Sequence, residues 1–174
     1  MAATMTINEV PRLQNGYTPT ISTRVYIDII DMKNAETKGI VPTMIDDAAR
    51  AKIKTYPLRR GIGVLEGSGG NIAVLTGNDG KLLIDSGFTV SKARIVEALD
   101  NLSPDPIAQL INTHWHVDHT DGNAWIHSAG ATIRAHENTK KHLSTSTRVE
   151  GWQYTFSPSP AGALPTTIFN EGGC

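Results

Sequence analysis

The chain has 174 residues, of which 39% are hydrophobic and 19% are charged, and this composition indicates a globular domain with a real core rather than a disordered chain. Its 16 basic and 17 acidic residues give a net charge of −1, so charge gives no reason to expect binding to nucleic acid or to a membrane surface. No apolar run approaches the ~18 residues of a transmembrane helix. The N-terminus lacks a basic stretch followed by an apolar one, so we expect no signal peptide and a cytoplasmic protein.

The first 55 residues are predicted to be an N-terminal extension. Residues 1–20 are polar and contain two prolines, which indicates a loose arm. Residues 24–30 are β-branched and apolar and predict a strand. A helix is predicted from Pro42 to about Thr55.

The main domain is predicted to span residues 56–174, where strand and helix patterns alternate. Residues 71–76 and 81–85 flank a G-N-D-G turn and predict a hairpin. The further predictions are a helix over 89–102, a strand over 107–112, a short helix over 124–128, a strand over 131–135 and a helix that starts at 138. Residues 151–167 have no clear period and predict a loop or lid. This alternation indicates a mixed α/β layered domain.

The stretch T-H-W-H-V-D-H-T-D-G-N, residues 113–123, follows the last of these buried strands. It places His114, His116, Asp118 and His119 within six residues. On an extended segment, residues i and i+2 point the same way, so both of the first two imidazoles can point toward one ion. A helical turn then brings the aspartate and the third histidine to the neighbouring side. Imidazole and carboxylate donors suit zinc or iron, so the pattern predicts a centre for two metal ions.

An H-x-H-x-D-H motif after an apolar strand resembles that of the metallo-β-lactamase fold superfamily. The preceding segment N-I-A-V-L-T…K-L-L-I-D-S-G, residues 71–87, resembles the same family, and the resemblance covers residues 56–169. It implies an αββα sandwich, of which this sequence holds only the first half, so the domain over 56–174 is expected to be truncated at its C-terminal end.

The resemblance also implies roles for individual residues. His114 and His116 would bind the first metal, and Asp118 and His119 would bind the second. Asp118 would also orient or deprotonate the attacking water. Asp85, at the end of its strand, matches a position that supports the metal site from behind; its alternative role is a helix cap or a turn residue.

The reaction implied is hydrolysis of a small molecule by a metal-bound hydroxide, most simply on two zinc ions. The substrate could be an ester, thioester, lactone, lactam or phosphodiester, and no residue chooses among them. A mononuclear iron oxygenase of the same superfamily is an alternative. His116 argues against the di-iron flavoprotein branch, which has glutamate there, and His119 argues against the zinc β-lactamases that have arginine there.

The family completes its centre with two further histidines and a bridging aspartate from later in the chain. His127, His136 and His142 lie outside the sequence context that the family uses, so we expect them to be surface or packed polar residues. The alternative function is therefore an incomplete fragment that binds metal weakly. Half of a sandwich would also leave an apolar sheet face uncovered, which a dimer or a complementary chain could cover.

Three other features bear on function. The glycine-rich residues 61–71 fit neither phosphate-loop pattern, and Ser68 has no G-x-S-x-G context, so neither a nucleotide site nor a serine hydrolase is expected. Trp152, Tyr154 and Phe156 alternate along one face of an extended segment. They either pack in the core or line the mouth of the metal site.

Overall fold

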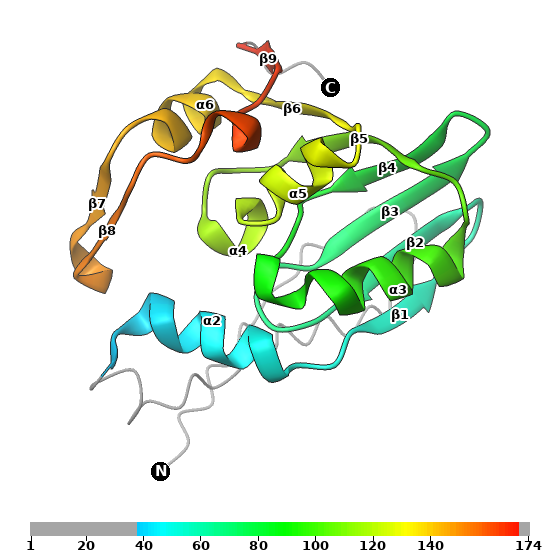
Figure 1. The fold of residues 1–174 in the computed structure, drawn as a ribbon, viewed down its shortest axis with the longest axis horizontal. Coiled ribbons are helices and arrows are strands. Elements are labelled where there is room, and N and C mark those ends of the chain that lie inside the picture. Colours follow the sequence, from blue (N-terminus) through cyan, green and yellow to red (C-terminus); the bar gives the residue numbers. More distant parts are fainter. Residues whose placement is uncertain (1–37, 171–174) are drawn as a thin grey trace, which may run out of the picture.

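Residues 38–170 are the part of the chain that the computed structural model describes (Figure 1). Its helices are α2 (Ile40–Arg50), α3 (Lys92–Leu102), α4 (Val117–Thr120), α5 (Asn123–Ser128) and α6 (Glu137–Ser144), with 3-10 turns η1 (Thr89–Ser91), η2 (Glu150–Trp152) and η3 (Ala161–Ala163). Its strands are β1 (Lys54–Pro57), β2 (Ile62–Glu66), β3 (Ile72–Gly77), β4 (Gly80–Ile84), β5 (Ile107–Asn112), β6 (Thr132–His136), β7 (Thr147–Val149), β8 (Tyr154–Phe156) and β9 (Thr167–Phe169). The predicted arm over 1–20 and the predicted strand over 24–30 lie outside the described residues.

Seven strands form one sheet in the order β1-β2-β3-β4-β5-β6-β9. The pairs from β1 to β4 are antiparallel, and the pairs from β4 through β5 and β6 to β9 are parallel. Gly77 pairs directly with Gly80, so only two residues turn the β3–β4 hairpin, as the G-N-D-G pattern predicts. Parallel neighbours need crossover connections, and α3 and α5 supply them. The predicted α/β fold class is confirmed.

Helices α3 and α5 pack on the same face of this sheet. The strands alternate, so that β3 and β4 turn every second side chain toward these helices. The helices bury the residues that recur every three or four positions on their inner faces. The buried cluster consists of Leu65, Ile72, Val74, Leu83, Ile95, Ala98, Leu99, Leu110, Ile126, Ala131 and Ile133. This core fixes the ends of β4 and β5, where the candidate site lies.

Helix α2 ends at Arg50, whereas the sequence predicted an end near Thr55, because the chain turns extended at Ala51 and then enters β1. Its Ala48 carbonyl accepts hydrogen bonds from Ser91 Oγ at 2.9 Å and from an Arg94 guanidinium nitrogen at 2.7 Å. The helix is thus joined to η1 and α3.

The segment predicted as a loop, residues 151–167, contains short regular elements. Strands β7 and β8 form an antiparallel pair of their own. Strand β9 pairs in parallel with β6 and is the last strand of the large sheet. The segment is therefore more regular than predicted, because its strands of three residues are too short to produce a readable period.

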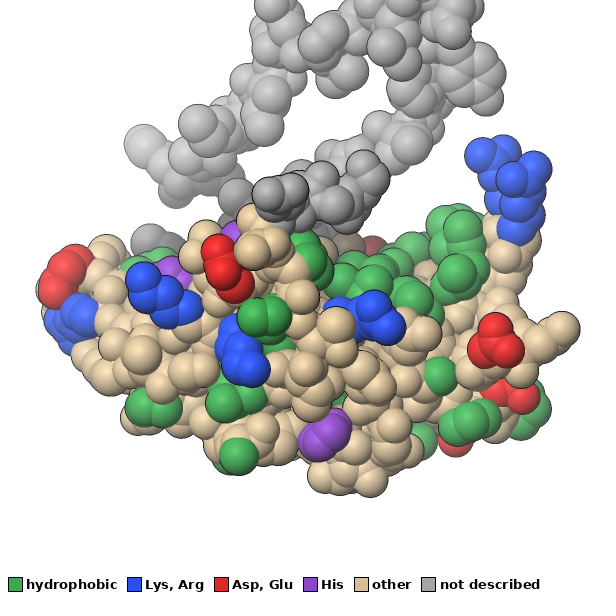
Figure 2. Space-filling view, turned by 90° about the horizontal axis from the view of Figure 1, so that it is seen from above, with side chains coloured by type: hydrophobic (Ala, Val, Ile, Leu, Met, Phe, Trp, Pro, Cys, Tyr) green, Lys and Arg blue, Asp and Glu red, His purple; other side chains and the backbone are tan. Residues whose placement is uncertain are grey.

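The other face of the large sheet carries partly exposed apolar side chains. Tyr56, Ile62 and Leu75 are 43%, 39% and 45% exposed, and by strand alternation they point away from α3. Seen from above, the surface shows hydrophobic side chains gathered in one area and charged ones scattered singly (Figure 2). Among residues 38–170, no helix is both long enough and apolar enough to cross a membrane.

Candidate metal centre

The candidate site lies where β4 and β5 end side by side. Asp85 follows β4 directly, and the motif residues follow β5. The two loops are joined by backbone hydrogen bonds from Ser86 N to His119 O at 2.9 Å and from Gly122 N to Gly87 O at 3.0 Å. The carboxyl ends of parallel strands are where open α/β sheets bind their ligands.

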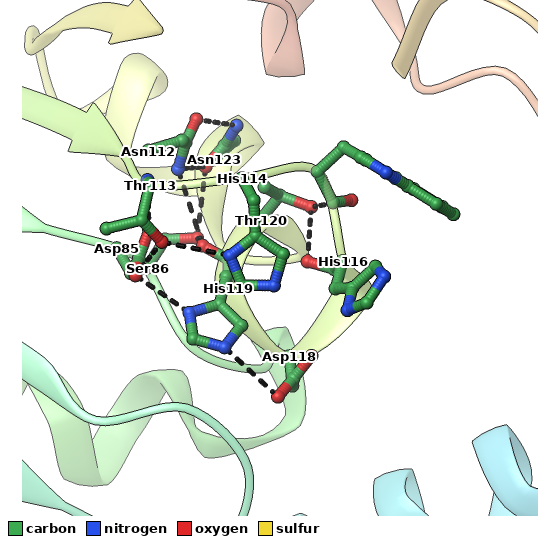
Figure 3. A network of polar contacts seen from close by, with 11 residues as sticks. Asp85, Ser86, Asn112, Thr113, His114, His116, Asp118, His119, Thr120 and Asn123 are labelled. Atoms are coloured by element: carbon green, nitrogen blue, oxygen red, sulfur yellow. Dashed lines mark hydrogen bonds and ion pairs between the residues drawn. The ribbon is translucent and has the colours of Figure 1, made fainter. Parts of the chain in front are cut away.

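His119 lies between two carboxylates (Figure 3). Its Nδ1 is 2.7 Å from Asp85 Oδ2, and its Nε2 is 3.3 Å from Asp118 Oδ2. Asp85 is 3% exposed and adopts a left-handed backbone, with φ of 66°, which aspartate tolerates better than most residues. This conformation directs its carboxylate across to the motif.

The charges of this group follow from its contacts. Burial alone would lower the pKa of His119, but hydrogen bonds and charge interactions with Asp118 and Asp85 raise it to about 9. Burial would raise the pKa of Asp118, but the hydrogen bond and charge of His119 hold it below its ordinary value. At neutral pH the imidazolium therefore donates to both carboxylates.

His114 is oriented through Thr113. The Thr113 backbone N–H and hydroxyl donate to Asp85 at 2.8 and 2.7 Å. Thr113 Oγ1 also lies 3.0 Å from His114 Nδ1. The hydroxyl proton is already used, so Oγ1 accepts a hydrogen bond from Nδ1–H, and His114 Nε2 remains as the unprotonated nitrogen. That is the tautomer a metal ligand needs, and Asp85 therefore supports His114 as well as His119.

His116 is held by ring contacts. Its ring centroid is 4.6 Å from that of His114 and 5.3 Å from that of Trp152. Burial lowers the pKa of His114 and of His116, and the neighbouring charge of His119 lowers both further. Both rings are therefore neutral at neutral pH, which is the form that binds a metal.

A buried network holds the motif from below. Asn123 is fully buried, and its Oδ1 lies 3.0 Å from both Ser86 Oγ and Asn112 Nδ2. Its Nδ2 donates to Asn112 Oδ1 at 2.8 Å and to the Ala163 carbonyl at 3.0 Å. Asn112 Nδ2 also donates to the His119 carbonyl at 3.3 Å. The amide pair thus joins the end of β5, the motif and η3.

The loop between β2 and β3 lies against the same residues. A Cβ on Gly70 would come within 2.6 Å of the His119 ring. Gly69 has φ of 92°, and a Cβ there would lie 2.7 Å from the Phe88 ring and 3.1 Å from Asp118 Cβ. Glycine is required at both positions because the loop backbone approaches the site so closely.

The site residues provide suitable donors for a metal, but too few of them. Neutral imidazoles and carboxylates are zinc and iron ligands. Among residues 38–170, however, no group of three or more His, Cys, Asp or Glu side chains is arranged to hold an ion. The two nitrogens of His119 are both engaged by carboxylates, so this ring would have to release Asp118 before it could bind.

The other three histidines have different surroundings. His127 Nδ1 lies 3.0 Å from the Ala131 carbonyl, and His136 caps α6 by accepting a hydrogen bond from Asn138 N. His142 stacks on Trp115, with ring centroids 4.9 Å apart. All three are used in packing or local hydrogen bonds, as the sequence predicted.

Sequence reasoning brought together His114, His116, Asp118, His119 and Asp85, and the structure places them in one cluster. It missed the supporting residues. Asn112, Asn123, Ser86 and the two loop glycines were seen only as strand ends, motif neighbours or turns. A polar residue inside an apolar strand, as Asn112 is in I-A-Q-L-I-N, was the available signal.

Comparisons with known proteins agree with this geometry. The family model described as the metallo-beta-lactamase superfamily matches residues 65–172. A subclass B3 metallo-beta-lactamase of Bradyrhizobium japonicum, BJP-1, is 24% identical, with a TM-score of 0.58, over 74% of this chain and 49% of that one. The MIM-2 metallo-beta-lactamase is 22% identical, with a TM-score of 0.59, over 76% of this chain and 53% of that one. A Cronobacter sakazakii metallo-beta-lactamase with a HARLDQ motif is 20% identical, with a TM-score of 0.58, over 69% and 49%.

The comparison with curated protein sequences gave no match. The solved structures are all less than 25% identical to this chain, so they bear on the fold alone, and the chain spans about half of their length. The family model, in contrast, matches more than half of the chain, from the end of β2 to beyond β9. By this match, and in agreement with its sheet and its motif, the chain belongs to the metallo-beta-lactamase superfamily.

Proposed function

We propose that this chain carries half of the metal centre of a metal-dependent hydrolase. One observation carries the proposal: three imidazoles and two carboxylates converge at the joined ends of β4 and β5, with two rings neutral and one of them held in a metal-binding tautomer. A merely structural cluster has no need of unprotonated, half-exposed imidazole nitrogens.

In this proposal, His114 and His116 hold a first ion, and Asp118 and His119 hold a second. Zinc suits these donors best, and iron is the alternative. When bound, the two ions would lower the pKa of a water between them and polarise the substrate carbonyl or phosphoryl oxygen. The substrate would be a small ester, thioester, lactone, lactam or phosphodiester.

The chain's own residues would provide orientation and proton transfer. Asp118 would orient the water and accept its proton, because its lowered pKa keeps it ionised at neutral pH. Asp85 would hold His119 directly and His114 through the Thr113 hydroxyl. These second contacts fix ring direction, which metal affinity depends on.

A second candidate function is a catalytically incomplete unit that binds metal weakly. It is favoured by the donor count, since each ion would have two ligands among the described residues instead of three or four. In a complete centre, the remaining ligands would come from residues outside 38–170, from a second copy or from a complementary chain.

Elemental analysis of the chain, purified without added metal, tests the proposal. About two zinc ions per chain, lost in a His114→Ala variant but retained in His127→Ala, would support the hydrolase centre. A screen of lactam, lactone, thioester and phosphodiester substrates would then follow. One iron and no zinc would favour the oxygenase reaction instead. Far less than one metal per chain would reject the two-metal centre and leave the incomplete unit.

A further inference from the structure

An aromatic cluster stands beside His116. It consists of Trp115 from the motif, His142 from α6, Trp152 from η2, and Tyr154 and Phe156 from β8. The cluster is separate from the buried core, which contains none of these residues. All five side chains are half-buried rather than fully enclosed.

The rings contact one another in sequence. Trp115 stacks on His142 at 4.9 Å and 22°, and it meets the Phe156 ring edge-to-face at 5.5 Å. Phe156 in turn contacts Tyr154 at 4.8 Å and Trp152 at 6.1 Å. Aromatic pairs prefer such geometries. The cluster therefore joins the β7–β8 pair to the motif.

Two features direct Trp152 toward the candidate metal centre. The η2 turn ends at Gln153, which has a left-handed backbone with φ of 48° and reverses the chain into β8. Trp152 thereby reaches the His116 ring, at 5.3 Å and a tilt of 54°. Along β8, Tyr154 and Phe156 point to the cluster, while Thr155 points the other way and is exposed. The β7–β8 pair stands apart from the large sheet, on the side of α4 (Figure 1).

Packing alone does not account for this arrangement. A hairpin outside the large sheet needs apolar contacts to hold it, but it does not need three partly exposed aromatic residues next to a histidine of the motif. The other side of that histidine faces the charged pair of His119 and Asp118. An apolar surface and a polar, charged group thus lie on either side of one imidazole.

We propose that the aromatic cluster is the subsite for the apolar part of the substrate, an aryl or alkyl group attached to the reacting carbonyl, with Trp152 as its main contact. The proposal rests on the proposed function for the place of the reacting group. It narrows the substrate class to molecules in which a hydrophobic side group and a carbonyl are a few bonds apart.

The three tryptophans of the chain allow a direct test, because each indole N–H gives its own NMR signal. Trp115 and Trp152 belong to the cluster, whereas Trp125 packs against the buried core with its indole nitrogen buried. The probe is 4-phenylbutyrate, and acetate is the control ligand that lacks an apolar group. We expect saturable shifts of the Trp152 and Trp115 signals with phenylbutyrate, none with acetate, and no shift of Trp125.

Matched variants identify the contact. Trp152→Ala should weaken phenylbutyrate binding roughly three- to tenfold, followed on the Trp115 signal, which corresponds to one lost aromatic contact. Thr155→Val, on the opposite face of the same strand, should leave binding unchanged. An unchanged Trp125 signal in both variants would show that the fold is intact.

Absence of saturable shifts, equal shifts of Trp125, or equal losses in the two variants would overturn the subsite. The probe needs no metal, so the outcome is separable from that of the proposed function. Probe binding in a chain without metal keeps the subsite and rejects only the hydrolase centre. Bound metal without probe binding rejects only the subsite.

Discussion

The two halves of the candidate site are built differently. Asp118 and His119, the hydrogen-bonded half, are held by carboxylate contacts, by backbone hydrogen bonds to the end of β4 and by the glycine loop. His114 and His116, the ring-contact half, have one side-chain hydrogen bond between them, from His114 to Thr113, and otherwise touch aromatic rings.

The difference shows which parts of the fold each half depends on. The hydrogen-bonded half is fixed by the large sheet, whose strands β4 and β5 end beside each other. The ring-contact half depends on the β7–β8 pair, which belongs to no larger sheet. We therefore expect the first half to be rigid before any ligand binds, and the second to adjust to what occupies it.

The largest effect is expected from Asn123→Ala. This fully buried amide contacts Ser86, Asn112 and Ala163, and its loss leaves several polar atoms buried without partners. The free energy of unfolding should fall by about 2–4 kcal/mol, measured by urea denaturation. Because the network also anchors the His119 carbonyl, the His119 ring signals in NMR should shift more than those of His116.

Asn101→Ala is the control, because Asn101 is exposed on α3. It should change the free energy of unfolding by less than about 0.5 kcal/mol. If both variants lost the same stability, or if His116 responded as strongly as His119, the network would not be what makes the hydrogen-bonded half rigid.

A smaller effect is expected from Gly70→Ala. The new Cβ would stand 2.6 Å from the His119 ring, and this ring cannot easily move because both of its nitrogens are hydrogen-bonded. We expect a loss of about 1–3 kcal/mol in the free energy of unfolding. Gly77→Ala is the matched control, since nothing lies within 4 Å of its Cβ. Equal stability of the two variants would mean that the ring is loosely held.

The sequence predicted much of the fold, because its strands and helices have clear periods. Strand β5 was predicted with its observed bounds, and the β3–β4 hairpin differed by a residue at its ends. Prediction failed where elements are short: β7, β8 and β9 have three residues each. Three residues carry too little alternation to separate a strand from a loop.

The candidate site was predictable where chemistry is concentrated in one segment. The motif residues and Asp85 are all close in the structure, although their binding roles stay predictions. The buried partners were not predictable, because Asn123 and Gly70 acquire their meaning only when separate loops meet. A glycine whose absent Cβ leaves room for a ring 49 positions away has no local pattern.

The smallest net effect is the pH dependence of stability in the metal-free chain, because the two halves act at opposite ends. The folded pKa of His119, about 9, lies above its unfolded value of 6.5. Its stabilising contribution is therefore complete below pH 6.5 and is lost as pH rises to about 9. His114 and His116 have folded pKa values below 6.5, so the unfolded chain takes up protons first and stability falls as pH drops below 6.5. The lowered pKa of Asp118 adds a loss only below its unfolded value of 3.8. Urea midpoints from pH 5 to 10, after treatment with a chelator, should therefore peak near neutrality. His119→Gln should flatten the alkaline side, and His116→Gln should flatten part of the acid side. The slopes decide, whatever stability each variant loses at its maximum. An unchanged alkaline slope in His119→Gln would show that the two carboxylates do not hold this imidazole as a cation, and the contrast between the halves would then lose its electrostatic basis.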